Sequence, residues 1–349
     1  MLAAISRWNR PGLIWGILGL AALAVPLAHR VTARRELARR LDRVAAVPLD
    51  RVAVPVALTT RGPLLASWQT VGGCGSGATT GSGGGVKWIG PVATGGLFNV
   101  LCQATYMAID DPTRQEHHLY VNSLISKDLS EKWNVGVSVP LVYKYLRDPY
   151  GLDVDLSNSG LGDIYLQVTR RLGAINDTSL TAAVGLPTGK YDQLYKNTPL
   201  RQHQQLGFGR VAGTLTLDHV MDELWGMMVV GGSASWRGGE NRLANYRAPS
   251  ASGYGYLGYY AGKLIPSVGL TLTGLPAHDR DRSQDELTGL FIAAPSVALE
   301  WSTDWIAFMA GASFPYQYDG VNRTSEGRPR TPWAWAPWSA SLAVSIAPF

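Results

Sequence analysis

The stretch that most constrains the fold runs from residue 160 to residue 190, with the sequence GLGDIYLQVTRRLGAINDTSLTAAVGLPTGK. Two runs of alternating apolar and polar or small residues flank the sequence AIND, and this pattern predicts two β-strands joined by a tight turn. Successive strand side chains point to opposite faces of a sheet, so the hairpin has one mainly apolar face. That face meets a core in a soluble sandwich. In a membrane barrel it meets lipid, while the polar face lines the lumen.

The composition favours the membrane barrel. The chain of 349 residues is 46% hydrophobic and only 16% charged, with 40 Gly, 12 Trp and 15 Tyr, whereas soluble domains have roughly 25% charged residues. Beyond the first thirty residues there is no apolar run of about 18 residues, which argues against membrane-spanning helices. These features are typical of an outer-membrane barrel, with a large β-sandwich as the alternative. The net charge of +5 comes largely from the N-terminal segment and does not indicate nucleic-acid binding.

Residues 1–33 have the pattern of an export signal. Arg7 and Arg10 precede an apolar run from Leu13 to Leu27. A run of about 15 residues is short for crossing a bilayer, so we interpret it as a signal peptide rather than as an inner-membrane anchor.

Residues 34–93 lack the alternating pattern. They are rich in Pro and Gly and contain a Gly/Ser/Thr tract at residues 72–85, which predicts a flexible segment that either plugs the barrel or serves as a periplasmic linker. Cys74 follows a lipoprotein-like sequence. Lipidation of Cys74, a disulfide between Cys74 and Cys102, and two free thiols therefore all remain open.

Residues 94–349 predict an all-β fold, a transmembrane antiparallel β-barrel of about twelve strands. The predicted strands lie near residues 95–109, 117–127, 133–146, 160–173, 178–189, 206–219, 224–236, 251–261, 264–275, 288–301, 305–318 and 337–349. Connections after even-numbered strands are short, such as residues 128–132, and those after odd-numbered strands, such as 110–116 and 191–205, are mostly longer and polar. An even-stranded outer-membrane barrel requires this alternation, since its turns face the periplasm and its loops face outside.

Aromatic residues recur near both ends of the predicted strands, where amphipathic rings prefer the lipid headgroup level. The candidates for these two membrane girdles are Trp133, Tyr143, Trp225, Trp236, Trp301, Trp305 and Trp338. The last predicted strand stops at Phe349 after Pro348. A terminal aromatic residue is common in barrels that the barrel-assembly machinery inserts, so we expect this machinery and the lipid bilayer as partners.

Polar residues on the opposite face of the strands are candidates for the lumen wall. They are Lys144, Asp163, Tyr165, Gln167, Arg171, Asp218 and Glu300. Charges of both signs across a lumen set the selectivity of a channel. The alternative is that these residues pair with one another and only satisfy the interior of the barrel.

The hairpin that opens with Gly160-Leu161-Gly162-Asp163 and ends with Leu186-Pro187-Thr188-Gly189, together with the preceding strand that begins KWNVGVSVPL, resembles a family of outer-membrane proteins. It is known as the putative MetA-pathway of phenol degradation family. The resemblance covers roughly residues 95–349, and its specific part is residues 118–190. It implies passive uptake of small organic molecules and supplies no catalytic residues.

We therefore expect an outer-membrane channel for small, aromatic or hydrophobic molecules. The alternative is a non-conducting barrel that scaffolds a partner. An outer-membrane lipase would need a serine beside a histidine on the lipid face, and the adjacent His117 and His118 show no such pairing. We expect no enzymatic activity, no metal and no cofactor.

Overall fold

The computed structural model describes residues 98–111, 114–147, 155–172, 177–195, 198–200, 205–243, 249–275, 279–281, 284–287, 290–303, 306–319, 333–335 and 338–346. The predicted signal peptide of residues 1–33 and the predicted segment 34–93 lie outside the described residues, as do Cys74, Trp305 and Phe349. None of the described residues belongs to a helix that is long and apolar enough to cross a membrane.

The regular secondary structure of the described residues consists of β-strands. Along the chain they are β1 (Asn99–Asp111), β2 (Arg114–Asp128), β3 (Trp133–Arg147), β4 (Leu156–Leu161), β5 (Ile164–Leu172), β6 (Thr178–Leu186), β7 (Leu194–Tyr195), β8 (Thr198–Pro199), β9 (Ala212–Glu223), β10 (Gly226–Arg237), β11 (Ser250–Tyr259), β12 (Leu264–Leu275), β13 (Asp279–Asp281), β14 (Gln284–Leu287), β15 (Leu290–Ser302), β16 (Ile306–Ser313), β17 (Tyr316–Asp319), β18 (Trp333–Trp335) and β19 (Trp338–Ile346).

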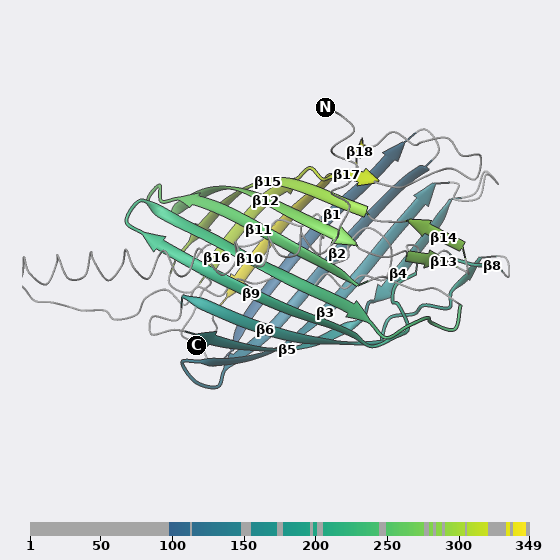
Figure 1. Cartoon of the computed structure of the whole chain (residues 1–349), viewed down its shortest axis with the longest axis horizontal. Coiled ribbons are helices and arrows are strands. Elements are labelled where there is room, and N and C mark those ends of the chain that lie inside the picture. Colours follow the sequence, from purple (N-terminus) through teal and green to yellow (C-terminus); the bar gives the residue numbers. More distant parts are fainter. Residues whose placement is uncertain are drawn as a thin grey trace, which may run out of the picture. The chain divides into compact units, whose positions relative to one another are not determined.

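Fifteen of these strands pair antiparallel into one barrel (Figure 1). The last strand, β19, pairs with β1 along nine residue pairs from Val100–Ile346 to Ala108–Trp338, so the sheet closes on itself. The pairs β4–β5, β16–β17 and β18–β19 are each two successive pieces of one barrel strand, which leaves twelve strands around the wall. The predicted antiparallel barrel of about twelve strands is thus confirmed. The two-stranded pairs β7–β8 and β13–β14 lie in connections outside this sheet.

Strand β3 shows how the sequence pattern becomes a two-faced wall. Val137 and Leu141 are 39% and 54% exposed, whereas Ser138 and Lys144, at alternating positions, are buried. In a closed barrel the buried positions face the interior and the exposed positions face outward. The exterior is therefore apolar and the interior polar. A closed barrel with an apolar exterior satisfies every backbone group within the wall and offers hydrocarbon to lipid. The protein accordingly spans the outer membrane of a Gram-negative bacterium.

The strand connections are short at one end of the barrel and mostly long at the other. Leu224 and Trp225 alone join β9 to β10, whereas residues 187–211 separate β6 from β9 at the opposite end. In outer-membrane barrels the short turns face the periplasm and the long loops face the outside. We assign the two ends of this barrel accordingly.

Several predicted boundaries differ from the structure, and the strand predicted at residues 160–173 begins at Leu156 and is broken between β4 and β5. Residues 110–116 are not a loop, because Asp111 pairs with Arg114 and the ladder of β1 and β2 continues to that point; polar residues can remain paired in a hairpin that extends beyond the membrane. The strand predicted at residues 206–219 is β9, which begins only at Ala212. Gly209 there adopts φ +77°, a conformation that interrupts an extended strand.

Leu166 lies in β5 opposite Val137 and is 45% exposed on the apolar exterior. We expect Leu166→Arg to lower the free energy of unfolding in liposomes by about 2–4 kcal/mol, because a charge would face the bilayer core. The matched control is Leu224→Arg in the short β9–β10 turn, where the side chain is 93% exposed and the cost should be about 0–1 kcal/mol. Urea titration in liposomes measures both values, and equal costs would contradict this assignment of faces.

Candidate functional site

The inner face of the barrel carries the candidate lumen residues. All of them have exposed fractions of 7% or less: Lys144, Asp163, Tyr165, Gln167, Arg171, Asp218 and Glu300. In β5 they alternate with exposed apolar residues such as Leu166 and Val168, which places their side chains on the inner face. They do not form one cluster but fall into groups with different partners.

Asp163 ties three parts of the chain together. It lies in the gap between β4 and β5, and its carboxylate accepts hydrogen bonds from the backbone N–H groups of Gly189 and Phe208, each at 3.0 Å. These two amides belong to the start and the end of the connection 187–211. The same gap is bridged by Thr188, whose hydroxyl donates to Gly162 O and accepts from Ile164 N, both at 2.9 Å. The base of the long connection is therefore fixed to the barrel wall at one point.

This arrangement brings the backbones of Gly189 and Gly207 so close together that neither residue has room for a side chain. A Cβ on Gly189 would lie 2.8 Å from Gly207 Cα, and a Cβ on Gly207 would lie 2.7 Å from the Asp163 carboxylate. Both positions therefore require glycine. The glycine of the Pro-Thr-Gly sequence has a structural reason, since it lets the Asp163 carboxylate reach both amides.

Residues 205–208, here called the inner segment, fold against the interior wall. Lys144 of β3 donates a hydrogen bond of 2.6 Å to the carbonyl oxygen of Gln205. Leu206 and Phe208 are buried, and Asn241 donates to the Phe208 carbonyl oxygen at 2.9 Å.

The inner segment reaches across several strands of the wall. The Arg237 guanidinium at the end of β10 lies 5.1 Å from the centre of the Phe208 ring. β3 and β10 are separated in the sheet by β5, β6 and β9, so the segment spans part of the extracellular mouth of the barrel. Its conformation is fixed further by the Gln205 side chain, which bonds to the backbone of Gln193 and Leu200.

A column of polar side chains faces the lumen beside Lys144. His118 of β2 pairs with Lys144 in the ladder, and its ring bonds to Glu116 and to the Tyr120 hydroxyl, each at 3.1 Å. The Lys144 ammonium group lies 6.0 Å from the centre of the Tyr120 ring. An ammonium, a carboxylate, an imidazole and a phenol thus share one stretch of wall, where Lys144, Glu116 and His118 are buried. The sequence predicts Lys144 on the lumen wall but leaves Glu116 in the preceding connection. His118 and Tyr120 lie within the predicted strand 117–127, and the alternation of that strand is the signal that could identify them.

The other candidate lumen residues lie elsewhere on the wall. Arg171, near the periplasmic end, forms an ion pair of 2.8 Å with Asp128. Asp218 accepts a hydrogen bond from the Tyr254 hydroxyl, and Tyr165 packs against alanines of β6 and β9. These contacts agree with the alternative that some of the polar residues satisfy one another within the interior.

The candidate girdle residues lie near the two ends of the barrel. Trp133, Trp225 and Trp301 are near the short turns, and Tyr143, Trp236 and Trp338 are near the long loops. All except the half-buried Trp301 are more than 40% exposed. Trp305 lies outside the described residues.

The described residues hold no group of three or more His, Cys, Asp or Glu side chains that could bind a metal ion. His117 lies on the outer face, where its Nδ1 is 2.6 Å from the Tyr106 hydroxyl and its ring stacks on Tyr145. Both of these contacts are to aromatic side chains.

We expect Asp163→Ala to release the base of the connection 187–211. The buried amides of Gly189 and Phe208 would lose their acceptor, at about 1–3 kcal/mol for each group. Hydrogen exchange at these two amides should accelerate, and trypsin should cleave faster at the exposed Lys190. The control is Asp192→Ala, an exposed aspartate of the same connection. Unchanged exchange in Asp163→Ala would contradict the role of this carboxylate.

Among solved structures, the chain is similar to an outer membrane channel from Pseudomonas putida F1, with 13% sequence identity and a TM-score of 0.55 over 72% of this chain and 95% of that chain. A FadL homologue of Pseudomonas aeruginosa has 11% identity and a TM-score of 0.39, over 72% of this chain and 75% of that chain. No protein-family model and no curated protein matches the chain. The first of these similarities establishes a shared barrel fold with an outer-membrane channel.

Proposed function

We propose that this protein is an outer-membrane channel for the passive uptake of small organic molecules, and that the inner segment restricts its lumen. The observation that carries the proposal is the hydrogen bond between Lys144 on the inner wall and the Gln205 carbonyl oxygen. A loop folded onto the inner wall narrows a barrel, and charged side chains at a narrow point select among solutes. The resemblance of the hairpin 160–190 to the phenol-degradation family supports the same class of function.

The preference for aromatic or hydrophobic solutes rests on apolar side chains that face inward. Met227, Val229, Tyr254 and Tyr256 cluster on the inner wall with Val220. A second cluster joins strands on both sides of the β1–β19 seam and includes Leu101, Leu124 and Met309. These clusters make parts of the inner wall apolar. We propose that aromatic or apolar solutes move along them.

We also propose that residues 34–93 enter the lumen as a plug. Several buried polar atoms on β1, β2, β3 and β19 have no hydrogen-bond partner in the described part of the chain: Asn99 Oδ1, Ser126 Oγ, Asn134 Oδ1, Ser339 Oγ and Ser345 Oγ. Buried polar groups are normally paired, and a segment that entered the barrel from the periplasmic side could supply their partners.

The position of β19 supports a proposed partner in biogenesis. This strand is the last of the barrel, and Leu342 and Ile346 on its outer face are exposed. We propose that the barrel-assembly machinery engages β19 before it pairs with β1.

The alternative function is a non-conducting barrel that scaffolds a partner in the outer membrane. The observation that favours it is the internal pairing of charged residues in the lumen, as in the Arg171–Asp128 ion pair. In that case the lumen would be sealed by its own side chains.

Single-channel recording in planar bilayers separates these functions. Steady conductance of the refolded full-length protein, with blockade by a phenolic solute, is the expected result. Conductance only after deletion of residues 34–93 would support the plug. Silence of both proteins, with folding verified by heat-modifiable electrophoretic mobility, would overturn the channel proposal and favour the scaffold.

Lys144→Met tests the role of the inner segment. Loss of the ammonium group removes a positive charge from the lumen and the hydrogen bond to Gln205, so conductance should rise and the permeability ratio should shift severalfold toward cations. The control is Lys132→Met, an exposed lysine in the β2–β3 turn. A reversal potential in a salt gradient that matches the control would contradict this role.

A further inference from the structure

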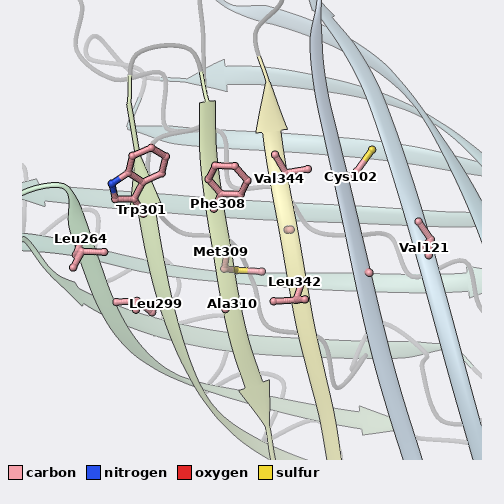
Figure 2. Close-up of a pocket in the computed structure, with 12 residues that line it drawn as sticks. Cys102, Val121, Leu264, Leu299, Trp301, Phe308, Met309, Ala310, Leu342 and Val344 are labelled. Carbon is pink, nitrogen blue, oxygen red and sulfur yellow. The ribbon is translucent and has the colours of Figure 1, made fainter.

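A groove of about 500 Å³ crosses the outer surface of the barrel at the seam where β19 pairs with β1 (Figure 2). Its walls come from six strands that are neighbours in the sheet: β12, β15, β16, β19, β1 and β2. Leu299, Phe308 and Leu342 on its borders are 44–65% exposed, so the groove opens onto the apolar exterior and not into the lumen.

The pairing of residues across the strands explains the hollow. Ala310 of β16 pairs with Leu342 of β19, and Leu342 pairs with Ala104 of β1. Two small side chains therefore flank a large one, which leaves a depression on each side of Leu342. In the next row toward the β15–β16 turn, Trp301 and Phe308 pair, with their ring centres 5.6 Å apart (Figure 2). These two rings border the end of the groove nearest the turn.

The groove offers hydrocarbon and almost no hydrogen-bonding chemistry. The backbone groups of its strands are paired within the barrel wall. The thiol of Cys102, a free cysteine, already has the Ser123 hydroxyl at 3.5 Å. A polar solute would lose its hydration in this groove without compensation. The occupant must therefore be apolar.

We infer that the groove binds one acyl chain of a phospholipid in the periplasmic leaflet. The groove is continuous with the outer surface that already faces the bilayer, and its aromatic end lies beside a short turn, which places it on the periplasmic side. A Trp ring prefers the level of the lipid headgroups. A chain that enters beside Trp301 would run along the wall toward Ala310 and Leu342, in the direction of the membrane centre.

The shape of the groove distinguishes the bound acyl chain from those of the surrounding lipids. A chain on a convex barrel surface contacts protein on one side only, whereas a chain in the groove contacts the Leu299, Phe308 and Leu342 side chains at once. Each carbon–carbon contact contributes only about 0.1–0.2 kcal/mol, but many contacts add up. The bound chain should therefore exchange more slowly with bulk lipid than its neighbours do.

Photo-crosslinking of the full-length protein tests the inference. In liposomes of phosphatidylethanolamine with a diazirine in one acyl chain, labelling should concentrate on peptides of β16 and β19. Ala310→Leu fills the groove and should lower this labelling roughly tenfold. The matched control is Ala182→Leu, another exposed alanine on the outer face, in β6, which should leave the labelling of β16 and β19 unchanged. Equal labelling of these strands in wild type and Ala310→Leu would overturn the inference.

A second copy of the chain is the competing occupant, and Cys102 reports on it. With Cys74→Ser, Cys102 is the remaining cysteine of the two in the sequence. A short bis-maleimide should give no dimer in liposomes if an acyl chain fills the groove. Efficient crosslinking that Ala310→Leu abolishes would overturn the acyl-chain assignment and identify the groove as a dimer interface.

Discussion

The pairing of β19 with β1 is the constraint on which the rest of the structure depends. No water reaches the backbone in the core of a bilayer, and each unsatisfied N–H or C=O group there costs several kcal/mol. Closure of the sheet removes both edges at once. The interruption between β4 and β5 is bridged by hydrogen bonds that replace the missing ladder. At the gap between β4 and β5, Gly162 N donates to Pro140 O and the Thr188 hydroxyl serves both Ile164 and Gly162.

The gap between β4 and β5 is also where the connection 187–211 is attached to the barrel wall. The gap frees Asp163 from the regular pattern and lets its carboxylate hold the connection 187–211 at both ends. The inner segment then reaches Lys144 and extends toward β10. Regular strands provide a stable cylinder, and the break between β4 and β5 positions the segment that lies in its mouth. Stability and restriction of the lumen thus depend on different residues of the same short stretch.

The sequence predicted the wall well because its information is local. The alternation in β3 identifies the inward Lys144 and the outward Tyr143 from neighbouring letters alone. The inner segment was missed for the opposite reason. Asp163 and Phe208 are 45 residues apart, and the sequence around either residue gives no indication of a contact with the other. Residues 206–211 also continue the apolar alternation of β9, so the pattern predicts a single strand over residues 206–219.

The groove on the exterior escapes prediction in a different way. A two-letter pattern counts alanine and leucine alike as apolar, so Ala104, Ala310 and Leu342 satisfy it equally. Their difference in side-chain volume creates a groove only when β1, at the start of the barrel, lies beside β19 at its end. Thr105 and Ser341, which are in contact across this seam, are 236 residues apart in the sequence. Polarity along each strand determines which face meets lipid. The sizes of side chains across strands determine how lipid fits that face. The barrel fold requires only that these side chains be apolar and does not determine their sizes.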